Sequence, residues 1–372
     1  MITPHRPLSS ASRILLLTLL AVVTTFQSHP LIIGQTGHGE TKPCIQGAGA
    51  TFPNPLYQEW FRLYYESNNK FAFDYQSKGS GFGIQQITAE TVDFAGSDAP
   101  MKDDQLKAAP RQILHIPTTM GAVVVTYNNP DFTEPLNLTP EALAGIYLGT
   151  IEKWNSPAIV WANPRLKLKD EDIAVVHRSD GSGTTFIFTD YLSKVSPKWK
   201  KDIGANASVN WPAGNGANGS EGVLNLINET PYSIGYVDYI YAKLGKMPMA
   251  PIQNSSGPFI TPTLQSITEA GDSAAIPNDM RASITNPPGY GAYPIASFTY
   301  FLVYKEQTDK FKGKALADFL WWAIHDGQEK CAGLNYAPLP SLVVDRAEKQ
   351  IDSMTFKDAR LRIPAAGKSG NQ

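Results

Sequence analysis

The segment 174–186 constrains the fold of this chain more than any other, because it joins an apolar strand to a helix through a polar turn. Its sequence is AVVHRSDGSGTTF. Apolar side chains recur at helical spacing from Phe188 to Val195, and Pro197 predicts the end of that helix. A strand that leads straight into a helix is the repeating unit of α/β folds, so we expect layers of helices on a sheet.

The turn within this segment carries the groups that bind an oxyanion. The start of a helix directs free backbone N–H groups and the positive end of its dipole towards one point. Glycines allow an anion to approach the backbone, Ser182 and Thr184 add hydroxyl donors, and Arg178 adds a fixed positive charge. We therefore interpret this turn as one part of an oxyanion site.

Two further glycine-rich turns precede predicted helices. Residues 47–55 (GAGATFPNP) lead into a helix expected at 55–65, and the Asn54-Pro55 pair fits a helix cap followed by a first-turn proline. Residues 76–83 (QSKGSGFG) lie between a predicted strand and a helical run at 84–89. A single turn of this kind is weak evidence, but three in an α/β pattern favour contact with a ligand.

Two carboxylates near these turns bear on which anion fits. Asp180 follows Arg178 by two residues and is expected to pair with it and fix its orientation. Asp98 lies in a polar strand end, 95–100, where a carboxylate repels an anion unless a proton lies between them. Phosphate carries such a proton at neutral pH and sulfate does not, so Asp98 predicts a site that accepts phosphate and rejects sulfate. The alternative role for Asp98 is that of a turn residue before a proline.

Motifs typical of several enzyme classes are missing. The sequence contains no P-loop, residue 52 is phenylalanine where a dinucleotide fingerprint needs its third glycine, and neither Ser80 nor Ser182 has the flanking glycines of a nucleophile elbow. His177 adjoins the turn, but in a strand its side chain faces away from that of Arg178. We therefore expect His177 to be structural and the protein not to be an enzyme.

Length and charge set the wider class. The chain has 372 residues and a net charge of −2, which suggests two domains and no nucleic-acid partner. The N-terminal residues 1–40 are expected to form a signal peptide, with an apolar run at 14–26 and cleavage between 28 and 41. No lipid-attachment pattern precedes Cys44, so tethering there is not expected. Cys44 and Cys331 either pair in a disulfide or remain two separate thiols.

The remaining secondary structure alternates between the two types. Strands are expected at 71–75, 92–95, 121–127, 173–176 and 300–304, and a further helix at 311–326. Residues 210–222 are rich in glycine and asparagine and predict an exposed loop. Residues 365–372 are expected to form a frayed tail.

Six blocks of sequence together resemble the periplasmic phosphate-binding proteins of bacterial phosphate ABC transporters (the PstS family). They span most of the chain after the N-terminal segment, and they lie at 47–53, 91–100, 146–154, 178–184, 233–237 and 336–340. The resemblance implies an α/β periplasmic binding protein of type II, with two mixed-sheet domains joined by two hinge strands. It implies one lobe at 45–118 plus 294–364 and a second at 119–293. The chain is expected to cross between them near 117–119 and 292–294.

The resemblance also implies a ligand, partners and residue roles. Inorganic phosphate would be held by Thr51, Phe52, Ser80, Asp98, Arg178, Ser182, Gly183 and Thr184, with Asp180 orienting the arginine. The protein would be an exported periplasmic monomer without cofactor or metal. It would deliver phosphate to the transmembrane permease, which works with its ATPase. Lys78 and Phe82 depart from the small residues that related chains often carry in the turn around Ser80, and they could tune affinity.

Three other functions remain open at the level of sequence. The site could take another tetrahedral oxyanion such as sulfate or molybdate. The protein could be a phosphatase that uses Ser182 as its nucleophile. It could also be an adhesin or a phosphate sensor that shares the fold, because a fold alone does not determine function.

Overall fold

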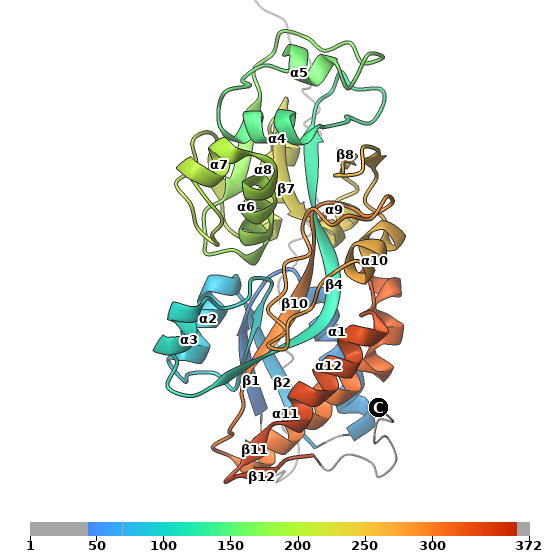
Figure 1. Ribbon diagram of the computed structural model, residues 1–372. Coiled ribbons are helices and arrows are strands. Elements are labelled where there is room, and N and C mark those ends of the chain that lie inside the picture. Colours follow the sequence, from blue (N-terminus) through green and yellow to red (C-terminus); the bar gives the residue numbers. More distant parts are fainter. Residues whose placement is uncertain (1–43, 69, 363–372) are drawn as a thin grey trace, which may run out of the picture. The chain divides into compact units, whose positions relative to one another are not determined.

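One mixed sheet of eight strands organises the protein in the computed structural model, which describes residues 44–68 and 70–362 (Figure 1). The order of its strands is β2-β1-β3-β10-β4-β7-β5-β6. Their bounds are β1 (Cys44–Gly49), β2 (Ala72–Ser77), β3 (Phe94–Ser97), β4 (Ile113–Asn128), β5 (Ala174–Arg178), β6 (Asn215–Ala217), β7 (Ser233–Asp238) and β10 (Ala296–Tyr304). Two small antiparallel pairs complete the strands, β8 (Ile252–Gln253) with β9 (Phe259–Ile260) and β11 (Thr355–Phe356) with β12 (Ala359–Arg360).

The long strand β4 belongs to both halves of this sheet. Its first part pairs antiparallel with β10 as far as Ala122, and its second part pairs antiparallel with β7 from Val123 onward. On the β10 side follow β3, β1 and β2, and on the β7 side follow β5 and β6. The register between β4 and β10 shifts at Thr299 and Tyr300, opposite Thr119 and Pro117.

Helices pack around each group of strands. Elements associated with β1, β2, β3 and β10 are α1 (Asn54–Asn68), α2 (Ser80–Thr88), α3 (Asp103–Ala108), α11 (Lys310–Ile324), α12 (Ser341–Asp352) and the short helices η1 (Asp326–Lys330) and η2 (Ala332–Leu334). The remaining helices are α4 (Pro140–Tyr147), α5 (Pro157–Val160), α6 (Gly183–Val195), α7 (Pro197–Asp202), α8 (Gly219–Glu229), α9 (Tyr239–Leu244) and α10 (Leu264–Asp272). None of the helices within 44–68 and 70–362 is long and apolar enough to span a membrane.

Aromatic side chains fill the cores beneath these helices. Phe94 of β3 stacks on Phe301 of β10 with ring centroids 4.4 Å apart. In the other half, Phe188 of α6 stacks on Tyr236 of β7, also at 4.4 Å. All four rings are buried, and offset aromatic pairs of this kind add to the free energy of burial. These contacts fix α6 against the sheet, and with it the polar turn at its start.

Four helices begin where parallel strands end, and this arrangement creates the site. Strand β1 runs parallel to β2 and β3, and β5 runs parallel to β6 and β7. Helix α1 follows β1, α2 follows β2, α6 follows β5 and α8 follows β6. Within each group the carboxyl ends lie at one edge, so α1 and α2 begin at one such edge and α6 and α8 at the other. The first group runs with β4 beside its first part, and the second runs against β4 beside its second part, so the two carboxyl edges face each other.

Most of the predicted elements are present, with one clear error. The expected strands and helices correspond to β2, β3, β4, β5, β10, α1, α2, α6 and α11, with ends shifted by a few residues or, for β4 and α2, extended further. The prediction of an exposed loop at 210–222 is confirmed for 210–214 and wrong for the rest, because β6 and the start of α8 lie within it and Ser220 is buried. Asn54 is the first residue of α1 rather than a cap before it, and its side chain accepts a hydrogen bond from Gln58.

The two cysteines are separate thiols. Cys44 lies in β1 and Cys331 is buried, where its sulfur accepts a hydrogen bond from Thr119. Burial raises the pKa of the Cys331 thiol to about 12, so it stays protonated at neutral pH. The signal-peptide prediction for 1–40, its cleavage range and the tail at 365–372 lie outside the described residues.

Candidate oxyanion-binding site

Arg178 lies at the centre of a buried polar cluster at the carboxyl end of β5. Its side chain is 1% exposed and donates Nε to Asp180 Oδ1 at 2.7 Å and Nη2 to Asp180 Oδ2 at 2.5 Å. The remaining nitrogen, Nη1, faces the hydroxyls of Thr51, Thr184 and Ser220 at 3.5, 3.2 and 3.1 Å. The bidentate pair fixes the plane of the guanidinium, so Nη1 presents its charge to the hydroxyl groups.

Asp180 orients Arg178, because both of its carboxylate oxygens accept hydrogen bonds from the guanidinium. Burial disfavours its charge, yet the hydrogen bonds and positive charge of Arg178 hold the pKa of Asp180 below its ordinary value. It also accepts the backbone N–H of Gly219, the first residue of α8, at 3.1 Å. The arginine and its carboxylate are therefore tied to the start of a second helix.

The start of α6 contributes its first turn to the cluster. Ser182 caps the helix, since its Oγ accepts the N–H of Thr185 at 3.1 Å. Gly183 and Thr184 are the next two residues, and both are buried. The first N–H groups of a helix have no partner within it, so those of Gly183 and Thr184 are available to an anion.

The first residues of α2 meet the turn before α6 and its first residue, Gly183, from the opposite half of the sheet. The backbone N–H of Gly81 donates to the carbonyl of Gly181 at 2.8 Å. A Cβ on Gly183 would lie 2.3 Å from Ser80 Oγ and 2.6 Å from Asp98 Oδ2. Only glycine at position 183 allows the two turns to approach this closely.

Asp98 lies directly after β3, and its residue is 1% exposed. Its Oδ1 accepts the hydroxyl of Thr299 at 2.7 Å, and its Oδ2 lies 3.5 Å from Ser80 Oγ. Burial, followed by repulsion from the Asp238 carboxylate, raises the pKa of Asp98 to about 8. In the ligand-free protein this carboxyl group therefore holds a proton at neutral pH. When it is ionised, it accepts a proton from a ligand.

Three residues of this cluster were not predicted from the sequence. Asp238, at the end of β7, accepts the hydroxyls of Thr184 at 3.0 Å and Ser220 at 2.7 Å. Burial raises the pKa of Asp238 against the opposing charge of Arg178. Ser220 also contacts Thr51 Oγ1 at 2.9 Å, and Tyr241 donates its hydroxyl to the carbonyl of Thr51 at 2.9 Å. Asp238 follows a buried strand just as Arg178 does, and that signal was available in the sequence.

The structure brings together every residue that the sequence analysis named for the site except the ring of Phe52. Those that meet at the cluster are Thr51, Ser80, Asp98, Arg178, Asp180, Ser182, Gly183 and Thr184. The Phe52 ring packs on Tyr336 with centroids 5.1 Å apart and fills the space over Gly121, so only its backbone can serve the site. 

Neighbouring residues outside the cluster behave as expected for structural side chains. The ring of His177 stacks on Trp211 with centroids 4.9 Å apart, and its Nδ1 lies 3.0 Å from the carbonyl oxygen of Arg178. The Lys78 ammonium lies over the ring of Phe82 at 5.1 Å. The ring quadrupole attracts a cation held over its face, so this contact holds the Lys78 ammonium against Phe82.

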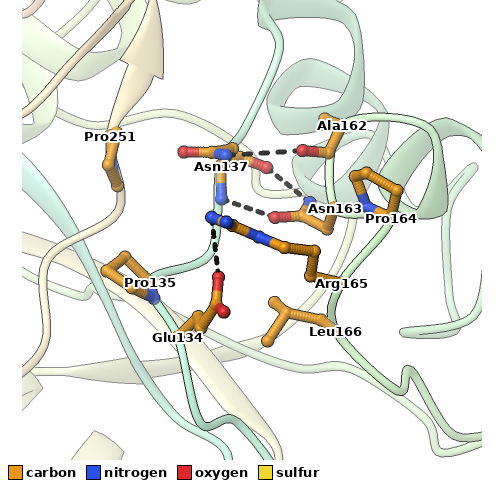
Figure 2. Close-up of a pocket in the computed structure, with 9 residues that line it drawn as sticks. All are labelled: Glu134, Pro135, Asn137, Ala162, Asn163, Pro164, Arg165, Leu166 and Pro251. Carbon is orange, nitrogen blue, oxygen red and sulfur yellow. Dashed lines mark hydrogen bonds and ion pairs between the residues drawn. The ribbon is translucent and has the colours of Figure 1, made fainter.

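A separate hollow lies away from this cluster, lined by residues that include Glu134, Asn137, Asn163 and Arg165 (Figure 2). Its volume is about 400 Å³. Arg165 pairs with Glu134 at 2.9 Å, and the Asn137 backbone N–H donates to Asn163 Oδ1 at 2.8 Å. Because these polar groups satisfy one another, the hollow is a weaker candidate for an anion than the cluster around Arg178.

The chain is similar to proteins of a known family. The profile of the PBP superfamily domain matches residues 34–326. The phosphate-binding protein PstS of Pasteurella multocida is 43% identical over 309 residues, which cover 82% of this chain and 89% of that protein. PstS of Methanocaldococcus jannaschii is 37% identical over 330 residues, covering 80% of this chain and 85% of that one.

A solved structure shares the fold at lower sequence identity. The phosphate-bound periplasmic phosphate-binding protein PfluDING matches with a TM-score of 0.67 and 21% identity, covering 82% of this chain and 93% of that one. The likeness confirms the two-lobed α/β architecture of a periplasmic binding protein. The profile match and the sequence identity to these relatives show that the chain belongs to the PstS family of phosphate-binding proteins within the PBP superfamily.

Proposed function

We propose that this protein binds inorganic phosphate in the periplasm and delivers it to the membrane permease of a phosphate ABC importer. The family relationship supports the transport role, and the relatives named above are phosphate-binding proteins. The observation that carries the choice of ligand is Asp98, a buried carboxylate among donors and beside the start of α6.

The donor set fits an oxyanion with a proton. Arg178, the hydroxyls of Thr51 and Thr184 and the first N–H groups of α6 are donors. Asp98 is the acceptor among them, and it requires a proton between itself and the ligand. When Asp98 is ionised, monohydrogen or dihydrogen phosphate supplies that proton, whereas sulfate would leave the carboxylate unpaired and repelled.

We assign the phosphate ligands accordingly. They are Thr51, Phe52, Ser80, Asp98, Arg178, Ser182, Gly183 and Thr184, with Asp180 as the residue that orients the arginine. Phe52 contributes its backbone N–H and not its ring. We add Ser220 and Asp238 as residues that orient the hydroxyls that hold phosphate, because Ser220 contacts the Thr51 hydroxyl and Asp238 accepts the Thr184 hydroxyl.

The assignment includes two lobes that close on the ligand. Lobe one comprises 45–118 and 294–364, and lobe two comprises 119–293. The register shift between β4 and β10 lies at the proposed crossing near 117–119. A bulge of this kind locally weakens strand pairing, which suits a hinge. Phosphate that contacts both lobes would shift the population to the closed form.

Hydrolysis is not favoured by the same geometry. The Ser182 hydroxyl accepts the N–H of Thr185 as a helix cap, and the nearest sequence candidate for a base, His177, is stacked on Trp211. A nucleophile needs a base within hydrogen-bond reach. We therefore propose that the protein binds its ligand without catalysing a reaction.

The rest of the proposal follows from the family relationship. The protein is an exported monomer without cofactor, metal or lipid anchor, and its partners are phosphate and the permease with its ATPase.

Calorimetric titration of the purified, anion-stripped protein tests the ligand. Phosphate should bind tightly, sulfate and molybdate should bind at least about a hundredfold more weakly, and Arg178→Ala should weaken phosphate binding by about 2 kcal/mol or more. Equal binding of sulfate would contradict the proposal.

Turnover of an aryl phosphate that is lost in Ser182→Ala would favour a phosphatase. Unchanged phosphate uptake in cells that lack the protein would favour a sensor or an adhesin.

A further inference from the structure

Three consecutive backbone carbonyls in the turn before α1 accept hydrogen bonds from three tyrosine hydroxyls. Tyr75 donates to the carbonyl of Ala50 at 2.9 Å, Tyr241 to that of Thr51 at 2.9 Å, and Tyr336 to that of Phe52 at 2.6 Å. The tyrosines come from β2, α9 and the segment after η2. Elements far apart in the sequence therefore converge on the backbone of one short turn.

These bonds determine where the amide protons of the turn point. In a planar trans peptide the carbonyl oxygen and the next N–H point in opposite directions. The bond from Tyr75 therefore directs the N–H of Thr51 away from Tyr75, and the bond from Tyr241 directs the N–H of Phe52 away from Tyr241. The third bond, from Tyr336, lies at a peptide whose nitrogen belongs to Pro53, so it fixes the entry into α1 instead of a donor.

The three tyrosine hydroxyls remain protonated and therefore remain hydrogen-bond donors. All three are buried, and burial raises the pKa of each phenol, so each keeps its proton at any physiological pH. A phenol donates a single hydrogen bond, and in each case a carbonyl of this turn accepts it. The carbonyls of the turn are consequently satisfied by the protein and turned away from the ligand.

We propose that Tyr75 and Tyr241 are positioning residues that direct the N–H groups of Thr51 and Phe52 at the bound anion, while Tyr336 fixes the entry of the same turn into α1. This inference rests on the proposed binding of phosphate. Tyr241 differs from the other two because it belongs to the 119–293 lobe and Thr51 to the 45–118 lobe. Its bond forms only when the lobes close, so Tyr241 couples closure to the orientation of the Phe52 amide.

Single tyrosine-to-phenylalanine variants test this role, because each removes only a hydroxyl. Tyr241→Phe should release phosphate about three- to tenfold faster, the effect of one lost hydrogen bond, with an unchanged association rate in stopped-flow measurements. Tyr75→Phe should weaken phosphate by a similar factor and slow association as well, since its bond preorganises lobe one before closure. In proton–nitrogen NMR of the phosphate complex, the Phe52 amide proton should move upfield in Tyr241→Phe.

Tyr191→Phe is the matched control. Tyr191 is a buried tyrosine of α6 whose hydroxyl has no hydrogen-bond partner among the described residues, so its loss should leave rates and the Phe52 amide shift unchanged. Unchanged release and an unchanged Phe52 amide in Tyr241→Phe would overturn the positioning role while wild-type binding still upheld the proposed function. Failure of the wild-type protein to bind phosphate would overturn the proposed function itself.

Discussion

At the scale of single residues, the character of the site follows from how few positive charges it contains. Arg178 is the one cation among the described residues that contacts the cluster, and two contacts of its guanidinium go to Asp180. Asp98 and Asp238 add two further buried carboxylates. An anion is therefore bound by fixed hydrogen-bond donors and hydroxyls rather than by net charge, and the direction of each proton decides which anion fits.

The first prediction concerns Asp98. In Asp98→Asn the amide oxygen can still accept from Thr299, and the amide nitrogen replaces Oδ2, which faces Gly183. An acceptor thus becomes a donor, and sulfate no longer meets a repelling carboxylate. We expect the preference for phosphate over sulfate to fall at least about tenfold, corresponding to about 1.4 kcal/mol. Parallel titrations with both anions measure it, and an unchanged preference would refute the role of Asp98.

The second prediction follows from the raised pKa of Asp98. Its folded-state pKa of about 8 lies above the ordinary 3.8, so between these values the folded protein binds a proton that the unfolded chain has lost. The stability of the ligand-free protein should therefore fall as the pH rises from about 4 to about 8. Thermal unfolding at pH 5 and pH 8 should show a larger loss for the wild type than for Asp98→Asn, in which this group does not titrate.

Asp238→Asn separates the two causes of that shift. Removing the neighbouring carboxylate removes the repulsion that adds to burial, so the pKa of Asp98 should fall, though not to its ordinary value. The loss of stability that Asp98 causes should then end at a lower pH than in the wild type. If the profile of Asp238→Asn matched that of the wild type, the two carboxylates would not interact as described.

At the scale of elements, the site depends on helix starts that meet across the sheet. The closest approach is between the start of α6 and the residues Ser80 and Asp98, and only a glycine at 183 permits it. The neighbouring contact of Gly81 with Gly181 is made by backbone atoms alone. We therefore expect side-chain size at these turns, more than chemistry, to control how completely the proposed lobes can close.

Gly183→Ala tests this steric requirement. The new Cβ would lie 2.3 Å from Ser80 Oγ, so the two turns must separate before phosphate can be held by both. We expect phosphate affinity to fall at least about tenfold, with faster release as the main cause. The matched control is Gly222→Ala in α8, where the added carbon meets its nearest neighbour, Ala217 Cβ, at an ordinary 3.6 Å. Equal phosphate affinity in the two variants would contradict the steric account.

What the sequence could predict also differs by element. Arg178, Ser182 and Thr184 were predictable because a strand, a turn and a helix follow one another directly, and local chemistry defines the donors. Ser220 was missed because its segment has the composition of an exposed loop, although β6 and α8 turn it inward. Tyr241 joins the site only through its contact with Thr51, 190 residues away. Contacts of that kind depend on packing, which no local pattern specifies.

At the scale of the whole molecule, contacts between the proposed lobes define the closed form. Besides those around Arg178, the Lys102 ammonium donates to Asn206 Oδ1 at 3.3 Å, and Tyr241 bonds to the carbonyl of Thr51. Both helix starts that face the anion carry partial positive charge, so without a ligand they repel one another. In the closed form that we propose, phosphate would reverse this balance by accepting from both sides at once.

The ligand-free protein should therefore open, and phosphate should close it. Small-angle X-ray scattering should record a smaller radius of gyration in saturating phosphate than in phosphate-free buffer, and sulfate at equal ionic strength should cause no such decrease. Arg178→Ala should need a higher phosphate concentration for the same decrease, because the anion then loses the charged contact that we assign to Arg178. A radius that does not respond to phosphate in a protein shown by calorimetry to bind it would mean that the lobes are already closed before binding. The affinity would then reflect a preformed site, and Tyr241→Phe would slow association instead of speeding release.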